Sequence, residues 1–186
     1  MEEMVYEYEK IRDRLTTMSC LMCEHKRWPY RWIGHTAGVV VQNRQVQVFE
    51  STSLNKWSGK CGVQLHPMST WLKHYNGKVW VRIYKDADTP EQMVYINQFI
   101  EQMLGCSYPS DKIKLFMAWF DFQWNGRDVL KYKGQDKGVF CTQLFMAWYK
   151  YPYIKSLLES LKIGSEYIPS DMDSLSNQWA DKIRIK

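Results

Sequence analysis

The alternation of apolar and polar positions predicts a β-hairpin in the first third of the chain. Apolar runs at residues 39–41 and 46–49 flank a polar stretch, residues 42–45. Two runs rich in β-branched residues on either side of a short polar turn are typical of a hairpin. If the turn is Asn43–Arg44, the pairing of every other position in the two strands follows from it.

This register places one acidic and one imidazole side chain on a common face. Side chains alternate along a strand, so His35, Ala37, Glu50 and Thr52 point to one side of the sheet and Gln47 to the other. His35 and Glu50 are then diagonal neighbours on adjacent strands, about 7 Å apart at Cα and within side-chain reach. A one-residue change in loop length would exchange Glu50 for Gln47. The pattern predicts a histidine held by a carboxylate.

A thiol would complete a cysteine hydrolase, and Cys141 is the best placed of the five cysteines. It follows a turn-rich stretch, residues 134–138, and precedes an apolar run that predicts a short buried helix ending before Pro152. A cysteine in the first turn of a helix lies at the positive end of the helix dipole, which favours the thiolate and lowers its pKa. A neighbouring imidazolium would lower the pKa further.

The remaining pattern predicts several short elements around the hairpin. Residues 5–15 suit a short helix, and strand character appears at residues 16–23. Residues 51–61 are polar and lysine-rich, which is typical of a loop or lid. Short strands are expected at residues 62–66 and 79–84, with a helix over residues 67–75 between them, and a last helix is expected over residues 154–163.

The clearest helix start lies at residues 88–91. It combines a capping side chain, proline in the first turn and an acidic residue that is favourable to the dipole. Gly105 is the expected stop. Its apolar stripe predicts a core-facing side, formed by Met93, Ile96, Phe99, Ile100, Met103 and Leu104.

Other histidines and cysteines are interpreted as structural. Cys20 and Cys23 have a spacing seen in zinc and redox sites, but no second ligand pair accompanies them. On a strand, positions three apart face opposite sides, so the two thiols would not share an ion. His66, which precedes a proline and has no acidic neighbour in sequence, and His74, on a lysine-flanked stretch, are expected at the surface.

Composition is that of a globular protein of one domain: 186 residues, 45% hydrophobic, 24% charged and a net charge of +5. Lysine and arginine are scattered, which fits an anionic substrate but does not argue for nucleic acid. The odd cysteine count, the lack of an apolar run of membrane-span length and the acidic start favour synthesis in a reducing cytoplasm.

Four motifs occur in one particular order, at residues 35–39 (HTAGV), 48–52 (VFEST), 62–68 (GVQLHPM) and 141–144 (CTQL). In this order they resemble the circularly permuted papain-fold enzymes of the NlpC-like superfamily, over about residues 11–150. That group includes bacterial peptidases or amidases, lecithin–retinol acyltransferase and a poxvirus branch. The histidine precedes the cysteine, as in the permuted relatives. Thr142 stands where serine is usual, and Gln143 where an acidic residue is frequent.

The resemblance implies an α+β fold: a small antiparallel sheet or half-barrel carrying His35 and Glu50, packed against helices that include the Cys141 helix. One domain would span residues 1–186, with a core at about 11–150 and a C-terminal extension at 151–186. Cys141 would be the nucleophile, His35 the base and Glu50 the residue that orients the imidazole. No cofactor or metal is expected.

Three side chains are expected to bind substrate. Thr52 shares the face of His35 and Glu50. Trp28 belongs to a basic aromatic loop, residues 26–32, that either walls a cleft or packs on the sheet. Tyr108 matches a position where the resembling family often carries an aromatic residue before the nucleophile helix.

The expected reaction is acyl transfer through a thioester, acting on the amide bond of a peptide, such as a cell-wall peptide. One alternative is a lipid-directed thioesterase or acyltransferase. Another is a non-enzymatic structural or interaction protein, for instance in a virus particle. The final site, a virion or host cell among the possibilities, is left open by the sequence.

Overall fold

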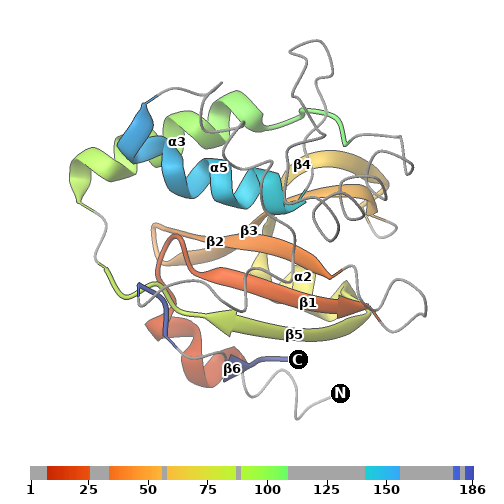
Figure 1. Ribbon diagram of the computed structural model, residues 1–186. Helices are drawn as coiled ribbons and strands as arrows, with labels where there is room; N and C mark the ends of the chain where they lie inside the picture. The colour runs from red at the N-terminus through yellow and green to blue at the C-terminus, as the bar shows by residue number, and fades with distance from the viewer. Residues whose placement is uncertain are drawn as a thin grey trace, which may run out of the picture.

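A six-stranded antiparallel sheet forms the centre of the protein (Figure 1). The structure, a computed structural model, describes residues 8–25, 34–55, 58–86, 89–108, 141–155, 178–180 and 183–186. The strand order across the sheet is β4-β3-β2-β1-β5-β6. The strands are β1 (Cys20–His25), β2 (His35–Gln42), β3 (Gln45–Asn55), β4 (Lys60–Pro67), β5 (Gly77–Arg82) and β6 (Ile183–Arg184).

Helices lie on both faces of this sheet. The described helices are η1 (Arg12–Arg14), which continues a helical turn at residues 8–11, α2 (Met68–His74), α3 (Pro90–Met103) and α5 (Cys141–Ile154). Figure 1 shows α3 and α5 side by side over one face, where they contact each other and α5 contacts β2 and β3. The opposite face is covered by α2 and the N-terminal segment. The fold is therefore α+β, as the sequence predicts.

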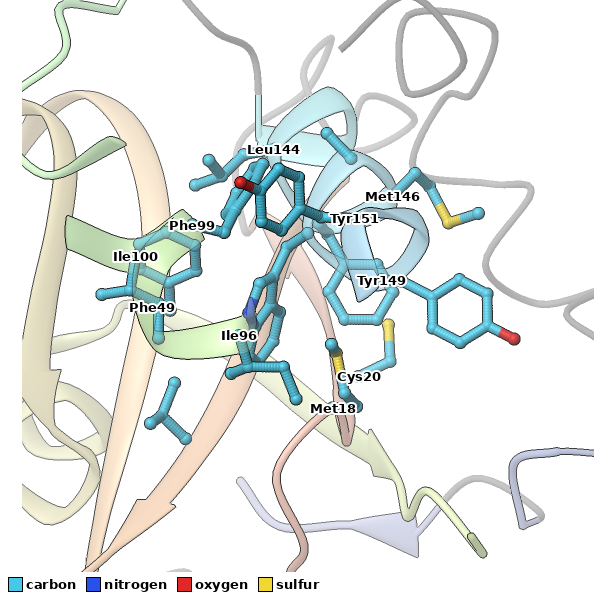
Figure 2. Packing of buried hydrophobic residues seen from close by; sticks show 14 of the residues in the cluster. Met18, Cys20, Phe49, Ile96, Phe99, Ile100, Leu144, Met146, Tyr149 and Tyr151 are labelled. Atoms are coloured by element: carbon cyan, nitrogen blue, oxygen red, sulfur yellow. The ribbon is translucent and has the colours of Figure 1, made fainter. Parts of the chain in front are cut away.

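Each face of the sheet has its own hydrophobic core because neighbouring strand residues point in opposite directions. One core joins Phe49 and other sheet residues to α3 and α5; Figure 2 shows Phe99, Leu144 and Tyr151 among its members. The second core joins Val39 and other sheet residues to α2 and residues 8–15. The sheet thus separates α5 from α2.

The hairpin forms in the predicted register. Gln42 pairs with Gln45, and the ladder continues to Gly38 opposite Phe49. Asn43 and Arg44 have φ of 50° and 62°. Two successive residues with positive φ give the turn a backbone twist that matches the right-handed twist of the strands. The alternation that places His35 and Glu50 on one face follows from this pairing.

Close contact between α5 and β2 depends on Gly38. A Cβ atom at this position would lie 2.2 Å from Cζ3 of Trp148, which is fully buried. The helix therefore approaches the strand at a point where only hydrogen fits, and this contact sets the depth at which α5 packs.

Three expectations about element ends were wrong. The proposed loop at residues 51–61 is largely strand, because β3 continues to Asn55 and pairs with β4 as far as Lys60, with a register shift after Thr52. α5 continues through Pro152 to Ile154. Pro152 is buried in the last turn, so its packing offsets the one backbone hydrogen bond that the missing N–H removes. Leu104 is not in the core but 43% exposed, because α3 ends at Met103.

The last described residues belong to the same sheet and core. β6 pairs with β5, and Ile185 is fully buried. The indole of Trp179 donates to the backbone oxygen of Met18 over 3.0 Å. Residues beyond position 150 therefore help to hold the sheet together. The expected helix at residues 154–163 lies outside the described residues from residue 156 onward.

The start of α3 supports a first testable prediction. Thr89 Oγ1 accepts from the Gln92 backbone over 3.2 Å, and Gln92 Oε1 accepts from the Thr89 backbone over 2.9 Å, the reciprocal arrangement of a capping box. We expect Thr89→Ala to lower the free energy of unfolding by about 1 kcal/mol, measured by urea denaturation. Gln98→Ala, at an exposed position within α3, is the matched control and should change it little. Equal effects of the two substitutions would contradict the capping role.

Candidate active site

The predicted histidine–carboxylate pair is present. Nε2 of His35, the first residue of β2, lies 2.8 Å from Oε2 of Glu50 in the middle of β3. The two side chains are 11% and 3% exposed. This hydrogen bond confirms the contact expected from the hairpin register.

Cys141 completes a cluster from three separate elements. It is the first residue of α5 and is buried. Burial lowers the pKa of His35, but the charge of Cys141, hydrogen bonding to Cys141 and Glu50, and the charge of Glu50 outweigh it and raise the pKa to about 10. The imidazole therefore lies between a thiol and a carboxylate, and its protonated form is the stable one at neutral pH.

Glu50 is kept ionised despite its burial. Burial raises its pKa, but hydrogen bonds from His35 and Trp71 and the charges of His35 and His66 bring it below the ordinary value. Removing a carboxylate from water is costly unless such partners compensate. The carboxylate thus has hydrogen-bond donors from β2 and α2, and the imidazole of His66 on β4 lies 3.8 Å away.

His66 is not at the surface, contrary to expectation. It is 8% exposed; its Nε2 lies 2.9 Å from Oε1 of Gln64 and 3.8 Å from Oε1 of Glu50. Burial, and to a smaller extent the charge of Lys60, lower its pKa, while Glu50 raises it. The reason is the β3–β4 register, which sets Gln64 opposite Glu50 and turns His66 toward the same face. Because residues two apart on a strand share a face, the positions of Gln64 and His66 could have indicated in the sequence that both side chains point to the same side of the sheet.

Tyr108 lies near Cys141. The segment after α3 is tied to β4 by Val63 N–H donating to Cys106 O over 2.8 Å and Gly105 N–H donating to Val63 O over 3.1 Å. Gly62 permits this approach, because a Cβ there would lie 2.2 Å from Cys106 O. Burial raises the pKa of Tyr108, and the charge of Cys141 raises it further. The proximity agrees with a site-lining position.

The other candidate residues are distributed differently. Thr52 is half-buried on β3, opposite Gly62. Trp28 lies outside the described residues. His74 is exposed at the end of α2, as expected.

The cysteines other than Cys141 are free thiols as well. Cys20 and Cys23 are 0% and 4% exposed, and they belong to the cores on opposite faces of the sheet. This confirms that the two thiols would not share one ion. Within the described ranges, no group of three histidine, cysteine or acidic side chains is arranged to hold a metal ion.

No helix in the described part of the chain is both long and apolar enough to span a bilayer.

Comparison with known proteins gives a fold but no family. No protein-family profile matches the chain, and no curated protein sequence matches it. Among solved structures, the chain is similar to YiiX from Escherichia coli O157:H7, described as a metalloprotein of DUF1105. The TM-score is 0.53 at 17% sequence identity, covering 91% of this chain and 96% of that one. This likeness extends over nearly the whole of both chains and shows a common fold alone.

Proposed function

We propose that the protein is a cysteine hydrolase with a permuted papain-like fold, in which Cys141 is the nucleophile, His35 the base and Glu50 the residue that orients the imidazole. The observation that carries this proposal is the position of His35, buried between the Glu50 carboxylate at 2.8 Å and the Cys141 thiol. A thiol is activated for acyl transfer when a base contacts it and an acidic residue in turn orients that base.

The chemistry follows from the two ring nitrogens of His35. Nε2 faces Glu50, which leaves Nδ1 for the thiol. His35 holds the proton of Cys141, and the thiolate attacks the carbonyl carbon of the substrate. Collapse of the tetrahedral intermediate breaks the amide bond, His35 gives its proton to the leaving amine, and a thioester remains. Water, deprotonated by His35, then attacks the thioester; the acid is released, and the Cys141 thiolate and the protonated His35 are regenerated.

The first residue of a helix also supplies an oxyanion donor. The first N–H groups of an α-helix point toward its N-terminal end, where the positive end of the helix dipole lies. The N–H of Cys141 is therefore the donor we assign to the oxygen of the tetrahedral intermediate, where a preorganised donor stabilises the developing charge. Tyr108 is proposed to line the same site.

The substrate class we propose is an amide bond in a peptide. Cys141 attacks a carbonyl carbon, and the bond to the leaving group then breaks. An amide nitrogen must be protonated before it leaves, and His35 can supply that proton. A peptide of the cell-wall type remains the first choice within this class. An acyl acceptor other than water would use the same thioester.

The reactivity of Cys141 provides the test. We expect iodoacetamide to alkylate Cys141 near pH 6 on the order of tenfold faster than an ordinary thiol, since a larger thiolate fraction outweighs the lower nucleophilicity of a more acidic thiol. His35→Ala should abolish this advantage. Mass spectrometry reads each cysteine separately as a function of pH.

Cys61 is the internal reference for this measurement, because it is an exposed free thiol in the same molecule. Its alkylation rate at each pH should be the same in the original protein and in His35→Ala, because Cys61 is an exposed thiol outside the proposed site. If Cys141 followed the same pH profile as Cys61, or if His35→Ala left its rate unchanged, the proposed function would be wrong.

A further inference from the structure

Two aromatic residues of the α2 region face the histidine–carboxylate pair. Trp71 and Tyr75 are four positions apart, so they lie on the same side of the helix. Tyr75 is the C-terminal cap residue of α2, and its N–H donates to Trp71 O over 2.8 Å. Trp71 is 2% exposed and donates a side-chain hydrogen bond to Glu50. The helix thus contacts the carboxylate directly.

The two rings continue the contact to the histidine. The ring centroids of Trp71 and Tyr75 are 4.7 Å apart with an interplanar angle of 21°. Those of Tyr75 and His35 are 6.4 Å apart with an angle of 19°. Three nearly parallel rings therefore form an offset stack that ends on the imidazole. Trp71, at one end, binds Glu50, and Tyr75 lies beside His35 in a nearly parallel, offset arrangement.

Tyr75 is itself held at two points. Nζ of Lys186 donates to the backbone oxygen of Tyr75 over 2.5 Å and also to that of Leu72, so a charged side chain binds the free carbonyls at the end of α2. The Tyr75 side chain forms a hydrogen bond with Cys23. Cys23 is the direct partner of His35 in the β1–β2 ladder. The ring is therefore anchored to β1, the strand that pairs with β2 at His35.

We propose that Trp71 and Tyr75 are positioning residues, which hold Glu50 and the His35 ring in the one orientation that lets the imidazole meet Cys141. The hydrogen bonds of the imidazole to Glu50 and Cys141 hold its two nitrogens but leave the ring able to rock about the line between them. A nearly parallel neighbouring ring restricts this motion. The inference rests on the proposed function, because the orientation matters only if Cys141 is activated by His35.

The experiment compares variants of Tyr75 that keep the aromatic ring with variants that remove it. Tyr75→Phe keeps the stacked ring, whereas Tyr75→Leu removes it, and Tyr75→Met removes it while filling more of the volume. Leu72→Ala is the matched control: Leu72 is 8% exposed on the same helix and belongs to the same core. The variants are compared by the alkylation rate of Cys141 near pH 6 and by NMR titration of the His35 ring.

We expect Tyr75→Leu and Tyr75→Met to slow alkylation by about tenfold, the change that one unit of pKa represents. The His35 titration midpoint should fall toward its ordinary value as the ring loses its fixed partners. Tyr75→Phe should keep the alkylation rate of Cys141 and the His35 titration midpoint near their values in the unsubstituted protein. Leu72→Ala should also change neither quantity, although it removes buried methyl groups. A purely structural role for Tyr75 predicts that Tyr75→Leu behaves like Leu72→Ala, which would overturn the inference.

The two proposals fail in different ways. An ordinary pH profile for Cys141 in the unsubstituted protein would overturn the proposed function. The His35 titration would still report on the stack, since the hydrogen bond to Glu50 does not depend on the thiol. Conversely, fast alkylation of Cys141 that persists in both Tyr75→Leu and Tyr75→Met would overturn the positioning role alone.

Discussion

Replacing Glu50 by alanine is expected to lower the free energy of unfolding by about 3–5 kcal/mol, the cost of removing one partner of a buried ion pair. Glu50 is 3% exposed and faces His35 at 2.8 Å and His66 at 3.8 Å. Without the carboxylate, the protonated His35 keeps Cys141 as a counterion but loses Glu50, and the Trp71 indole loses its acceptor. Urea denaturation of the two proteins measures the difference.

The difference should also depend on pH. The pKa of His35 is raised to about 10, so its contribution to stability is complete below the ordinary value of 6.5 and is lost as pH rises toward 10. The pKa of Glu50 is lowered from 4.5, so its contribution is present above that value and is lost as pH falls through the lower, folded-state pKa. The effect of Glu50→Ala should therefore be largest between these ordinary values and smaller at both extremes.

Glu50→Gln is the control for shape. It keeps an oxygen that accepts from His35 and removes the charge, so we expect a smaller loss of stability with a much weaker pH dependence. An effect of Glu50→Ala that stayed constant from acid to alkaline pH would show that the loss comes from packing rather than from the ion pair.

Gly38→Ala is the second substitution with a large expected effect. The added Cβ would lie 2.2 Å from Cζ3 of the fully buried Trp148, so α5 or β2 must move. Overpacking of this kind costs about 1–3 kcal/mol. Because Cys141 is the first residue of the same helix, we also expect its fast alkylation to weaken.

A double-mutant cycle with Trp148→Phe tests the cause. Trp148→Phe alone leaves a cavity and destabilises the core. In the double variant the smaller ring leaves room for the Cβ atom, so the loss should be less than the sum of the two single losses. Strictly additive losses in denaturation would show that Gly38 is required for another reason, such as its backbone conformation.

Local patterns were sufficient for the hairpin and for the first two members of the site. The polar turn at residues 42–45 fixed the register because each strand has a period of two, and one turn then determines every pair. His35 and Glu50 follow from that register alone. The start of α3 was equally readable, since Thr89, a proline and an acidic residue occupy the positions that a helix N-terminus favours.

His66, Trp71 and Tyr75 reach the site through contacts between elements that no local pattern specifies. His66 has no acidic neighbour in sequence; its acidic neighbour lies across the β3–β4 ladder, whose register shifts between Thr52 and Asn55. Such an irregularity moves the pairing by an amount that composition does not reveal. The roles of Trp71 and Tyr75 likewise required knowing which face of the sheet α2 covers.

Element ends were misjudged where tertiary packing outweighs local preference. Pro152 stays in α5 because the last turn is held by burial, including Tyr151 in the core. Leu104 fits the apolar period of α3 but falls just after its end. Trp28, expected either to wall a cleft or to pack on the sheet, lies outside the described residues.

The separation of the site along the chain has a consequence for synthesis. His35 and Glu50 are only 15 positions apart and meet within one hairpin, whereas Cys141 arrives from a distant segment by packing of α5 on β2. Contacts of long sequence separation form late, since a large loop must be closed first. In a nascent or misfolded chain Cys141 would therefore be an ordinary thiol with a pKa of about 8.5. If the proposed function holds, a chain that has not finished folding lacks hydrolase activity. The activity appears only once Trp148 packs against Gly38.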